Sequence, residues 1–146
     1  MDLDIREIAY GSAEYRQGKL LRDAVLRRPL GLALSEEDVK QDPNNKHFGA
    51  FQEDVLVGCV MLHPVDAHTA QLKHMAIASD VQRHGVGRRL IAHFEAAAKA
   101  LGYRTICMEA RVTAQGFYAT LGYQVVSEPY MHQATGLPHV KMLKHI

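Results

Sequence analysis

Residues 71–102 read QLKHMAIASDVQRHGVGRRLIAHFEAAAKALG, and the rest of the chain is interpreted around them. Their pattern predicts a strand over 71–77, a loop over 79–87, and a helix that starts near Gly87 or Arg88 and stops at Gly102. The apolar stripe of this helix consists of Val86, Leu90, Phe94, Ala97, Ala98 and Leu101. The stretch is therefore expected to form a strand–loop–helix unit with one buried helix face.

The loop between this strand and this helix is suited to binding an anion. The first amide groups of a helix have no partner within it, and the positive end of the helix dipole lies there. Gly85 and Gly87 remove two side chains at the place where a phosphate would approach the backbone. The sequence therefore predicts a phosphate or pyrophosphate site at the start of the helix.

Two familiar phosphate-binding patterns do not fit this loop. A dinucleotide-binding fold would need a third glycine where Leu90 stands, and a nucleotide-triphosphate loop would need Gly-Lys-Ser/Thr, which the sequence lacks. The pattern Gln/Arg-x-x-Gly-x-Gly/Ala does fit, as Gln82-Arg83-His84-Gly85-Val86-Gly87. It resembles the pyrophosphate-binding loop of the GNAT superfamily of acetyl-coenzyme A-dependent acetyltransferases. The alternative is a strand-to-helix turn that binds nothing.

Composition and charge fit one ordinary domain. The chain has 146 residues, 47% of them hydrophobic, and a net charge of +1 with both signs mixed. These values give no electrostatic argument for nucleic acid or a membrane surface, and no apolar run approaches the length of a membrane span. The N-terminus at residues 1–4 has no signal-peptide character, and Cys59 and Cys107 form no ligand pair. We expect a cytoplasmic protein with reduced thiols.

The remaining segments predict a mixed α/β domain that spans residues 1–146 and is built on one sheet. The expected strands are 3–9, 47–51, 55–63, 71–77, 104–110, 123–126 and 140–143, and the expected helices are 15–28, 87–101 and 115–121. Ser35 would suit the cap of a short helix, but a turn at 42–45 follows closely. Residues 31–45 are therefore expected to be irregular and near the surface, and whether they close over a substrate stays open.

Two further motifs strengthen the resemblance. The segment FYATLGY at 117–123 resembles the GNAT signature aromatic-Tyr-x-x-Leu-Gly-aromatic. The ending GLPHVKM at 136–142 looks like the small-residue-Pro-His-apolar-x-Met pattern of the branch that contains the glyphosate N-acetyltransferase family. Three more features of that family have counterparts here, namely Val25-Leu26-Arg27, Lys73 before Met75, and Ala110-Arg111.

The resemblance implies the GNAT fold, a central mixed β-sheet flanked by helices, with acetyl-coenzyme A as cosubstrate. It assigns the acetyl and pantetheine part of the cofactor to the main chain of Met75, Ala76 and Ile77. It assigns the pyrophosphate to Arg83, His84, Gly85, Val86, Gly87 and Arg88. No metal is expected, since the histidines show no His-x-x-x-His or His-Glu-x-x-His spacing.

The transfer chemistry needs a base for the amine and a proton donor for the leaving thiolate. By resemblance, Tyr118 is the proton donor and His139 is the base, close enough to the acceptor to help bind it. Arg27, Lys73 and Arg111 match that family's cationic cradle for an anionic substrate. The family has an arginine where this chain has Lys73. A lysine keeps the positive charge but lacks the planar guanidinium group that forms two parallel hydrogen bonds.

Each of these roles has a plainer alternative. Tyr118 would also suit packing under the sheet, and His139 would be satisfied by a main-chain carbonyl. Arg111 would suit a strand-end surface position, and Arg27 the basic last turn of a helix. Glu109 matches the glutamate base of many amino-terminal acetyltransferases, and a structural salt bridge is the alternative for it.

The expected function is therefore acetyl transfer to the amine of a small, anionic molecule by direct attack in a ternary complex. A peptide or protein N-acetyltransferase of the same fold is the second reading, and a non-catalytic coenzyme A-binding module is the third. No nucleic acid or membrane partner is expected. A homodimer formed through the last strands is a further implication of the resemblance.

Overall fold

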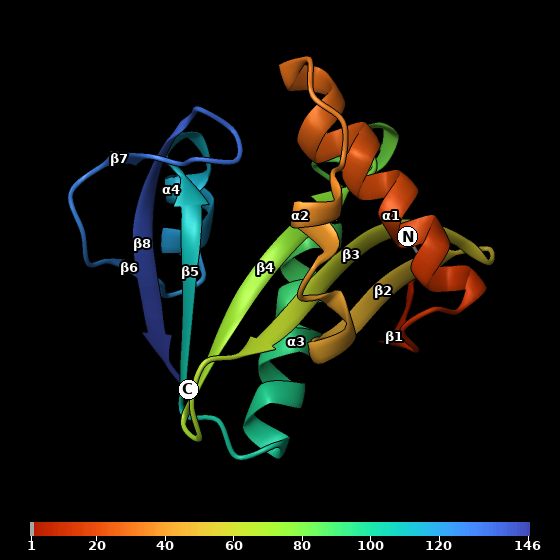
Figure 1. Cartoon of the computed structure of the whole chain (residues 1–146). Helices are drawn as coiled ribbons and strands as arrows, with labels where there is room; N and C mark the ends of the chain where they lie inside the picture. Colours follow the sequence, from red (N-terminus) through yellow and green to blue (C-terminus); the bar gives the residue numbers. More distant parts are fainter. Residues whose placement is uncertain (1) are drawn as a thin grey trace.

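The computed structural model describes residues 2–146 and contains one mixed sheet with helices on both faces (Figure 1). The strands are β1 (Asp4–Ile8), β2 (Lys46–Gln52), β3 (Val55–Pro64), β4 (Thr69–Ile77), β5 (Thr105–Arg111), β6 (Gln124–Val125), β7 (Tyr130–Met131) and β8 (Pro138–His145). The helices are α1 (Ala13–Arg22), α2 (Glu36–Val39), α3 (Val86–Ala100) and α4 (Gln115–Thr120). The predicted fold class is confirmed, while residue 1 of the expected domain lies outside the described residues.

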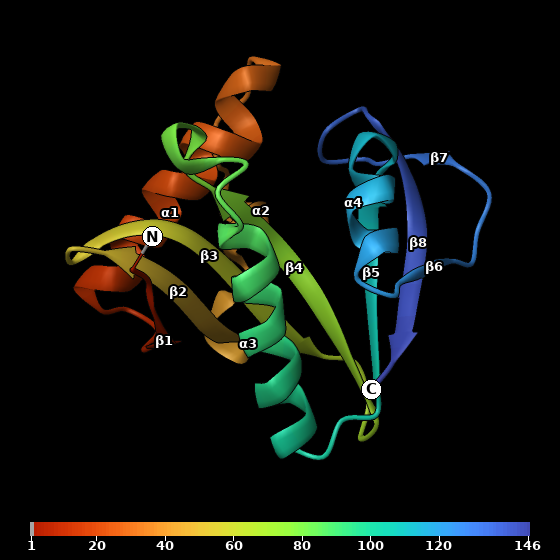
Figure 2. The same ribbon diagram turned by 180° about the vertical axis from the view of Figure 1, so that it is seen from behind.

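The sheet order is β1-β2-β3-β4-β5-β8-β6, with β7 also paired to β8. All neighbours are antiparallel except β4 and β5, which run parallel. Helices α1 and α2 cover one face, and α3 and α4 cover the other (Figure 1, Figure 2). Because both faces are covered, β3 is buried along most of its length, as a central strand should be.

The sheet divides the core into two clusters. The larger one packs under α3 and α4 and includes Leu90, Phe94 and Tyr118. The smaller one packs under α1 and includes Tyr15 and Phe51. The buried residues of α3 match most of the predicted stripe, which confirms the helical period.

The sheet opens between β4 and β5, where the two strands pair only from Thr69–Gln71 to Thr105–Cys107. Figure 1 shows them meeting at one end and separating toward the other. A bulge in β4 contributes to this divergence, because the pairing with β3 shifts register between Cys59 and Met61. Bulges bend a strand and increase its twist, so β4 turns away from β5 and exposes main-chain groups along that edge.

Three local predictions need correction. The first helix does not run to residue 28, because it passes into a π-helical turn (Asp23–Arg27) and a 3₁₀ turn (Arg28–Leu30). Strand β7 was not predicted, since it has only two residues. Residues 31–45 do not lie wholly at the surface, because Asp42 is 1% exposed.

Two further observations concern the described residues. Cys59 and Cys107 are both unbridged, as expected. Within residues 2–146, the helices are too short or too polar to cross a membrane.

Candidate functional site

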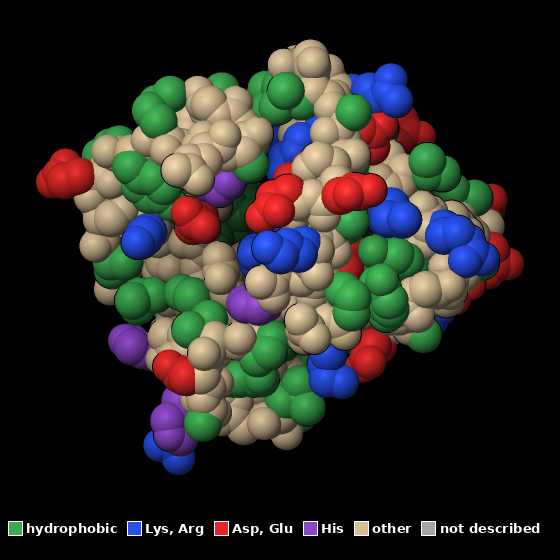
Figure 3. Space-filling view, viewed as in Figure 1, with side chains coloured by type: hydrophobic (Ala, Val, Ile, Leu, Met, Phe, Trp, Pro, Cys, Tyr) green, Lys and Arg blue, Asp and Glu red, His purple; other side chains and the backbone are tan. Residues whose placement is uncertain are grey.

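A cleft of about 1420 Å³ opens where β4 and β5 separate. One wall is formed by the π-helical turn after α1, the α2 segment, β4 and the start of α3, and the other by β5, α4, β7 with the loop after it, and β8. Figure 3 shows a hollow in this face with basic, acidic and histidine side chains around it. The cleft brings together most of the predicted site residues, namely Arg27, Lys73, Met75, Ile77, Arg83, Gly85, Val86, Gly87, Arg88, Arg111, Tyr118 and His139.

Two predicted cofactor residues do not line the cleft. Ala76 is 1% exposed and lies in the core under α1, since alternate residues of a strand face opposite sides of the sheet. His84 is exposed on the loop before α3. Only main-chain contacts to a ligand are compatible with the position of Ala76.

The loop before α3 has the geometry of an anion site. Arg83 and Gly85 both have left-handed backbones, with φ of 72° and 79°. The Gln82 side chain donates to the Ile77 carbonyl at 3.0 Å and ties the loop to the end of β4. Helix α3 has no side-chain cap, and its first turn has amide groups without helical partners. Alternating backbone conformations of this kind form a concave nest of N–H groups that suits a phosphate.

His74 lies at the bulge in β4 and lines both the cleft and a second cavity. His74 has φ of 52°, which is uncommon for a non-glycine residue. The second cavity is small and is also lined by Tyr15, Arg22 and His47. Burial, with Arg22 and Lys73 nearby, lowers the pKa of His74 to about 3, so the ring is neutral at physiological pH. His74 is therefore a neutral, largely buried side chain between the second cavity and the cleft, which Lys73 and Met75 also line.

Tyr118 lies on α4 and lines the cleft with 8% of its surface exposed. Burial raises the pKa of Tyr118 to about 12, and nearby Arg111 opposes this rise. Its phenol is therefore protonated at neutral pH and able to donate a proton.

His139 begins β8 and is 5% exposed. Its Nδ1 lies 3.0 Å from the Leu137 carbonyl oxygen. Because a carbonyl only accepts, Nδ1 carries the proton and Nε2 keeps a lone pair. Arg111 stands directly opposite His139 in the β5–β8 register. In the neutral form of the ring, Nε2 is therefore the nitrogen that can accept a proton.

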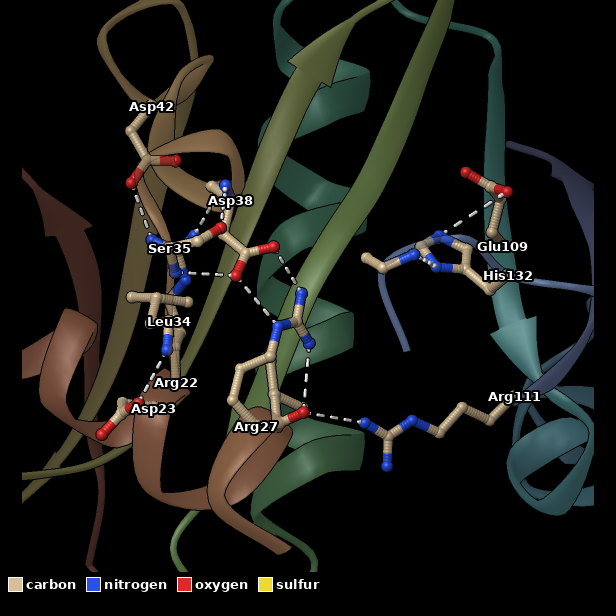
Figure 4. Close-up of polar contacts among 12 residues, drawn as sticks. Arg22, Asp23, Arg27, Leu34, Ser35, Asp38, Asp42, Glu109, Arg111 and His132 are labelled. Carbon is tan, nitrogen blue, oxygen red and sulfur yellow. Dashed lines mark hydrogen bonds and ion pairs between the residues drawn. The ribbon is translucent and has the colours of Figure 1, made fainter. Parts of the chain in front are cut away.

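The three predicted cations differ in their environments. Arg27 forms a two-point ion pair with Asp38, with distances of 3.0 Å from Nε to Oδ2 and 2.9 Å from Nη2 to Oδ1. Arg111 donates from Nη2 to the Leu26 carbonyl at 3.2 Å, a contact that spans the cleft (Figure 4). Within residues 2–146, no ion pair involves Lys73 or Arg111. The uncompensated positive charge is therefore that of Lys73 and Arg111, while Asp38 offsets Arg27.

Hydrogen bonds connect residues 31–45 to α1 and to the turn that follows it. Buried Asp42 accepts from the Tyr15 hydroxyl at 2.6 Å and from Arg22 Nη1 at 2.7 Å. Asp23 accepts from the Leu34 amide at 2.8 Å, at the other end of the segment. These contacts make the segment a fixed part of the cleft wall that contains β4.

Replacing Asp38 with asparagine tests this wall. Breaking a buried pair leaves Arg27 uncompensated, so we expect Asp38→Asn to lose roughly 3 kcal/mol of stability at pH 7 in urea unfolding. Although burial alone would raise it, the pKa of Asp38 is held far below its usual range by Arg27 and Ser35. The wild-type advantage is therefore complete above about pH 4 and declines only as the pH falls toward the lowered pKa.

The exposed neighbour Glu37 supplies the matched control for this experiment. Its side chain is 83% exposed and pairs with Lys40 at 4.0 Å. Glu37→Gln should change stability by less than about 0.5 kcal/mol. Equal effects of the two variants would contradict the structural role of the Arg27–Asp38 pair.

Sequence reasoning missed three side chains of the cleft, namely Asp38, Tyr130 and His132. The Tyr130 hydroxyl donates to Glu109, and His132 Nε2 lies 3.9 Å from Glu109 Oε2. All three lie in irregular or very short segments, where no periodic pattern marks which side chains face the cleft.

Comparisons with known proteins agree with this geometry. Residues 30–146 match the model of the acetyltransferase (GNAT) domain. A Bacillus subtilis protein named as an acetyltransferase is 30% identical over 127 residues, which cover 85% of this chain and 84% of that protein. A crystal structure from Lactobacillus plantarum, described as an N-acetyltransferase, is 28% identical with a TM-score of 0.87, covering 98% and 97% of the two chains. A structure from Elizabethkingia anophelis, a GNAT family acetyltransferase with acetyl-coenzyme A bound, is 19% identical with a TM-score of 0.76, covering 99% and 98%.

Proposed function

The chain belongs to the GNAT acetyltransferase family, and we propose that it acetylates the amine of a small molecule that carries an anionic group. One observation carries this proposal. A single cleft holds an uncapped helix start, the open edge of β4, Tyr118 and His139, with the uncompensated charges of Lys73 and Arg111 beside them.

Acetyl-coenzyme A is the proposed donor, as in the similar Elizabethkingia anophelis structure, which holds it. Its pyrophosphate would lie against the first amide groups of α3, where the dipole and the free N–H groups favour negative charge. Its pantetheine arm would run along β4 at Met75 and Ile77, because β5 has left that edge unpaired. The arm would then add to the sheet as an extra strand does.

The residues on the two walls suit direct transfer. The acceptor amine must lose a proton to attack the thioester carbonyl, and His139 Nε2 is the proposed base. The new N–C bond forms as the thioester carbonyl oxygen becomes an oxyanion. When this tetrahedral intermediate collapses, the C–S bond breaks. Tyr118 then gives its proton to the departing thiolate. The acetyl group passes from sulfur to nitrogen without a covalent enzyme intermediate.

The acceptor class follows from the charges on the walls. Lys73 and Arg111 come from β4 and β5, so an anionic group between them would be held from two sides. Arg27 contributes less than the sequence suggested, because Asp38 offsets its charge. An acidic amino acid or an aminophosphonate fits this arrangement, as in the branch resembling glyphosate N-acetyltransferase. Because Lys73 lacks a planar guanidinium group, we expect no strict requirement for a planar anionic group on the acceptor.

A panel of amines tests the function directly. Release of free thiol from acetyl-coenzyme A would be followed with acidic amino acids, aminophosphonates, polyamines, aminoglycosides and short peptides. We expect turnover mainly with the acidic small amines. Preference for peptides would instead support a peptide N-acetyltransferase, and binding of acetyl-coenzyme A without turnover of any amine would support a non-catalytic module.

Substitution of Arg111 tests the anion site. Loss of one charge-assisted contact of about 1.5–3 kcal/mol should raise the KM for an acidic acceptor by roughly 10- to 100-fold in Arg111→Gln. The KM for acetyl-coenzyme A should stay within about twofold, because the proposed cofactor groups lie on β4 and α3. Arg104→Gln is the matched control, since Arg104 is exposed and lies outside the cleft. An unchanged acceptor KM in Arg111→Gln would rule out the anion role.

A further inference from the structure

Two histidine rings stack on the acceptor side of the cleft. The ring centres of His132 and His139 are 4.5 Å apart, with 31° between their planes. His139 begins β8, whereas His132 follows β7, and both line the cleft. His132 is therefore the ring in direct contact with the proposed base.

The loop that carries His132 is closed by its own hydrogen bonds. The His132 amide donates to the Leu137 carbonyl at 2.9 Å, and the Gly136 amide donates to the His132 carbonyl at 2.8 Å. The Leu137 carbonyl also accepts from His139 Nδ1. One carbonyl oxygen thus fixes both the loop and the base.

The tautomer of His132 follows from a third contact of the loop. The Ala134 amide donates to His132 Nδ1 at 3.2 Å, so Nδ1 has no proton and the neutral ring carries it on Nε2. That Nε2 lies 3.9 Å from Glu109 Oε2, too far for a direct hydrogen bond but within ion-pair range when the ring is charged. Glu109 is fixed in turn by the Tyr130 hydroxyl.

Charged groups face this ring pair from every element packed around it. Strand β5 contributes Glu109 and Arg111, and β8 contributes Lys141, which lies opposite Glu109. Lys73 and Arg27 act from the opposite wall, and Tyr130 from β7. Burial, then His139, lowers the pKa of His132, and Glu109 opposes that effect. His132 is thus mainly uncharged at neutral pH.

We propose that His132 is a positioning residue that holds the His139 ring by stacking, and that the neutral His132 ring and Glu109 both favour the protonated form of His139. This role rests on the proposed function of His139 as the base. When His139 Nε2 takes the amine proton, the new cation lies against a neutral aromatic ring and near one carboxylate, and both favour it. A protonated His132 would oppose it, since two stacked cations repel.

Proton NMR titration of the histidine rings in the resting protein tests the coupling. In His132→Phe, which keeps a stacked neutral ring, we expect the titration midpoint of His139 to change by less than about 0.3 pH unit. In Glu109→Gln, we expect it to fall by roughly 0.3–1 pH unit, because a favourable negative charge is lost. His145→Phe, an exposed position at the far end of β8, should leave it in place.

The acidic limb of kcat/KM should stay in place in His132→Phe and move to lower pH in Glu109→Gln. His132→Ala should lower kcat by about tenfold with the KM for acetyl-coenzyme A unchanged, whereas His132→Phe should keep kcat within about threefold at its optimum pH. A large shift of the His139 midpoint in His132→Phe, or an unmoved midpoint in Glu109→Gln, would overturn the inference. Full activity of His139→Gln would instead overturn the proposed base, and the NMR titration would still decide the coupling because it needs no turnover.

Discussion

Replacing Tyr118 with phenylalanine is expected to lower kcat by about 100-fold or more while acetyl-coenzyme A binds as before. The phenol is buried and its pKa is raised to about 12, so it holds its proton throughout the physiological range. Without that proton the thiolate must leave as a bare anion in a site with little water. Steady-state kinetics would measure kcat, and calorimetry would measure the cofactor dissociation constant.

Tyr123→Phe is the matched control for this variant. Tyr123 is also buried, but its hydroxyl donates to Glu95 at 2.8 Å, and its side chain does not line the cleft. Its loss should cost about 1 kcal/mol of stability and leave kcat within about twofold. Full turnover in Tyr118→Phe would remove the proton-donor role, whereas a comparable loss in Tyr123→Phe would point to a general defect in folding.

The strand–loop–helix unit could be predicted from the sequence because its signals are local. Alternation and the helical period placed a strand at 71–77 and a helix near 87, close to β4 and α3 as observed. The cleft itself depends on the bulge at His74, where a non-glycine residue adopts a left-handed backbone. The resemblance assigned cofactor binding to the main chain of Met75, Ala76 and Ile77, but the sequence did not indicate which residue would produce the bend.

The charge distribution of the site was harder to predict, because it depends on pairs far apart in the chain. Arg27 was expected to be a cation available to substrate, yet Asp38 reaches it from a segment expected to be irregular. The π-helical turn over Asp23–Arg27 places the Leu26 carbonyl where both Arg27 and Arg111 donate to it. Ion pairs and hydrogen bonds between residues distant in the chain produce no periodic pattern in the sequence.

The two walls of the cleft divide the chemistry between them. The wall of β4 and α3 offers main-chain groups, which suit a cofactor with a fixed structure. The wall of β5, α4 and β8 offers the side chains Arg111, Tyr118 and His139, to which the proposed mechanism assigns the reaction and much of the acceptor binding. Substitutions on the second wall should therefore alter kcat or the acceptor KM, and leave cofactor affinity largely intact.

Substitution of His139 should produce the second large effect. We expect His139→Gln to lower kcat/KM for the acceptor by roughly 100- to 1000-fold at pH 7, because the amine is then mostly charged and no base lies in contact with it. The deficit should shrink as the pH rises toward the pKa of the acceptor amine, since solvent then supplies the neutral nucleophile. Rates measured from pH 6 to about pH 10 would show this recovery.

The exposed His145 at the other end of β8 provides the control, and His145→Gln should follow the wild-type profile throughout. A constant deficit of His139→Gln at all pH values would mean that the ring orients the acceptor without removing its proton. Wild-type rates in His139→Gln would mean that another residue on the same wall acts as the base. Glu109 would then be the next candidate, because it lies on the same face of the sheet and its carboxylate would hold a water near the amine.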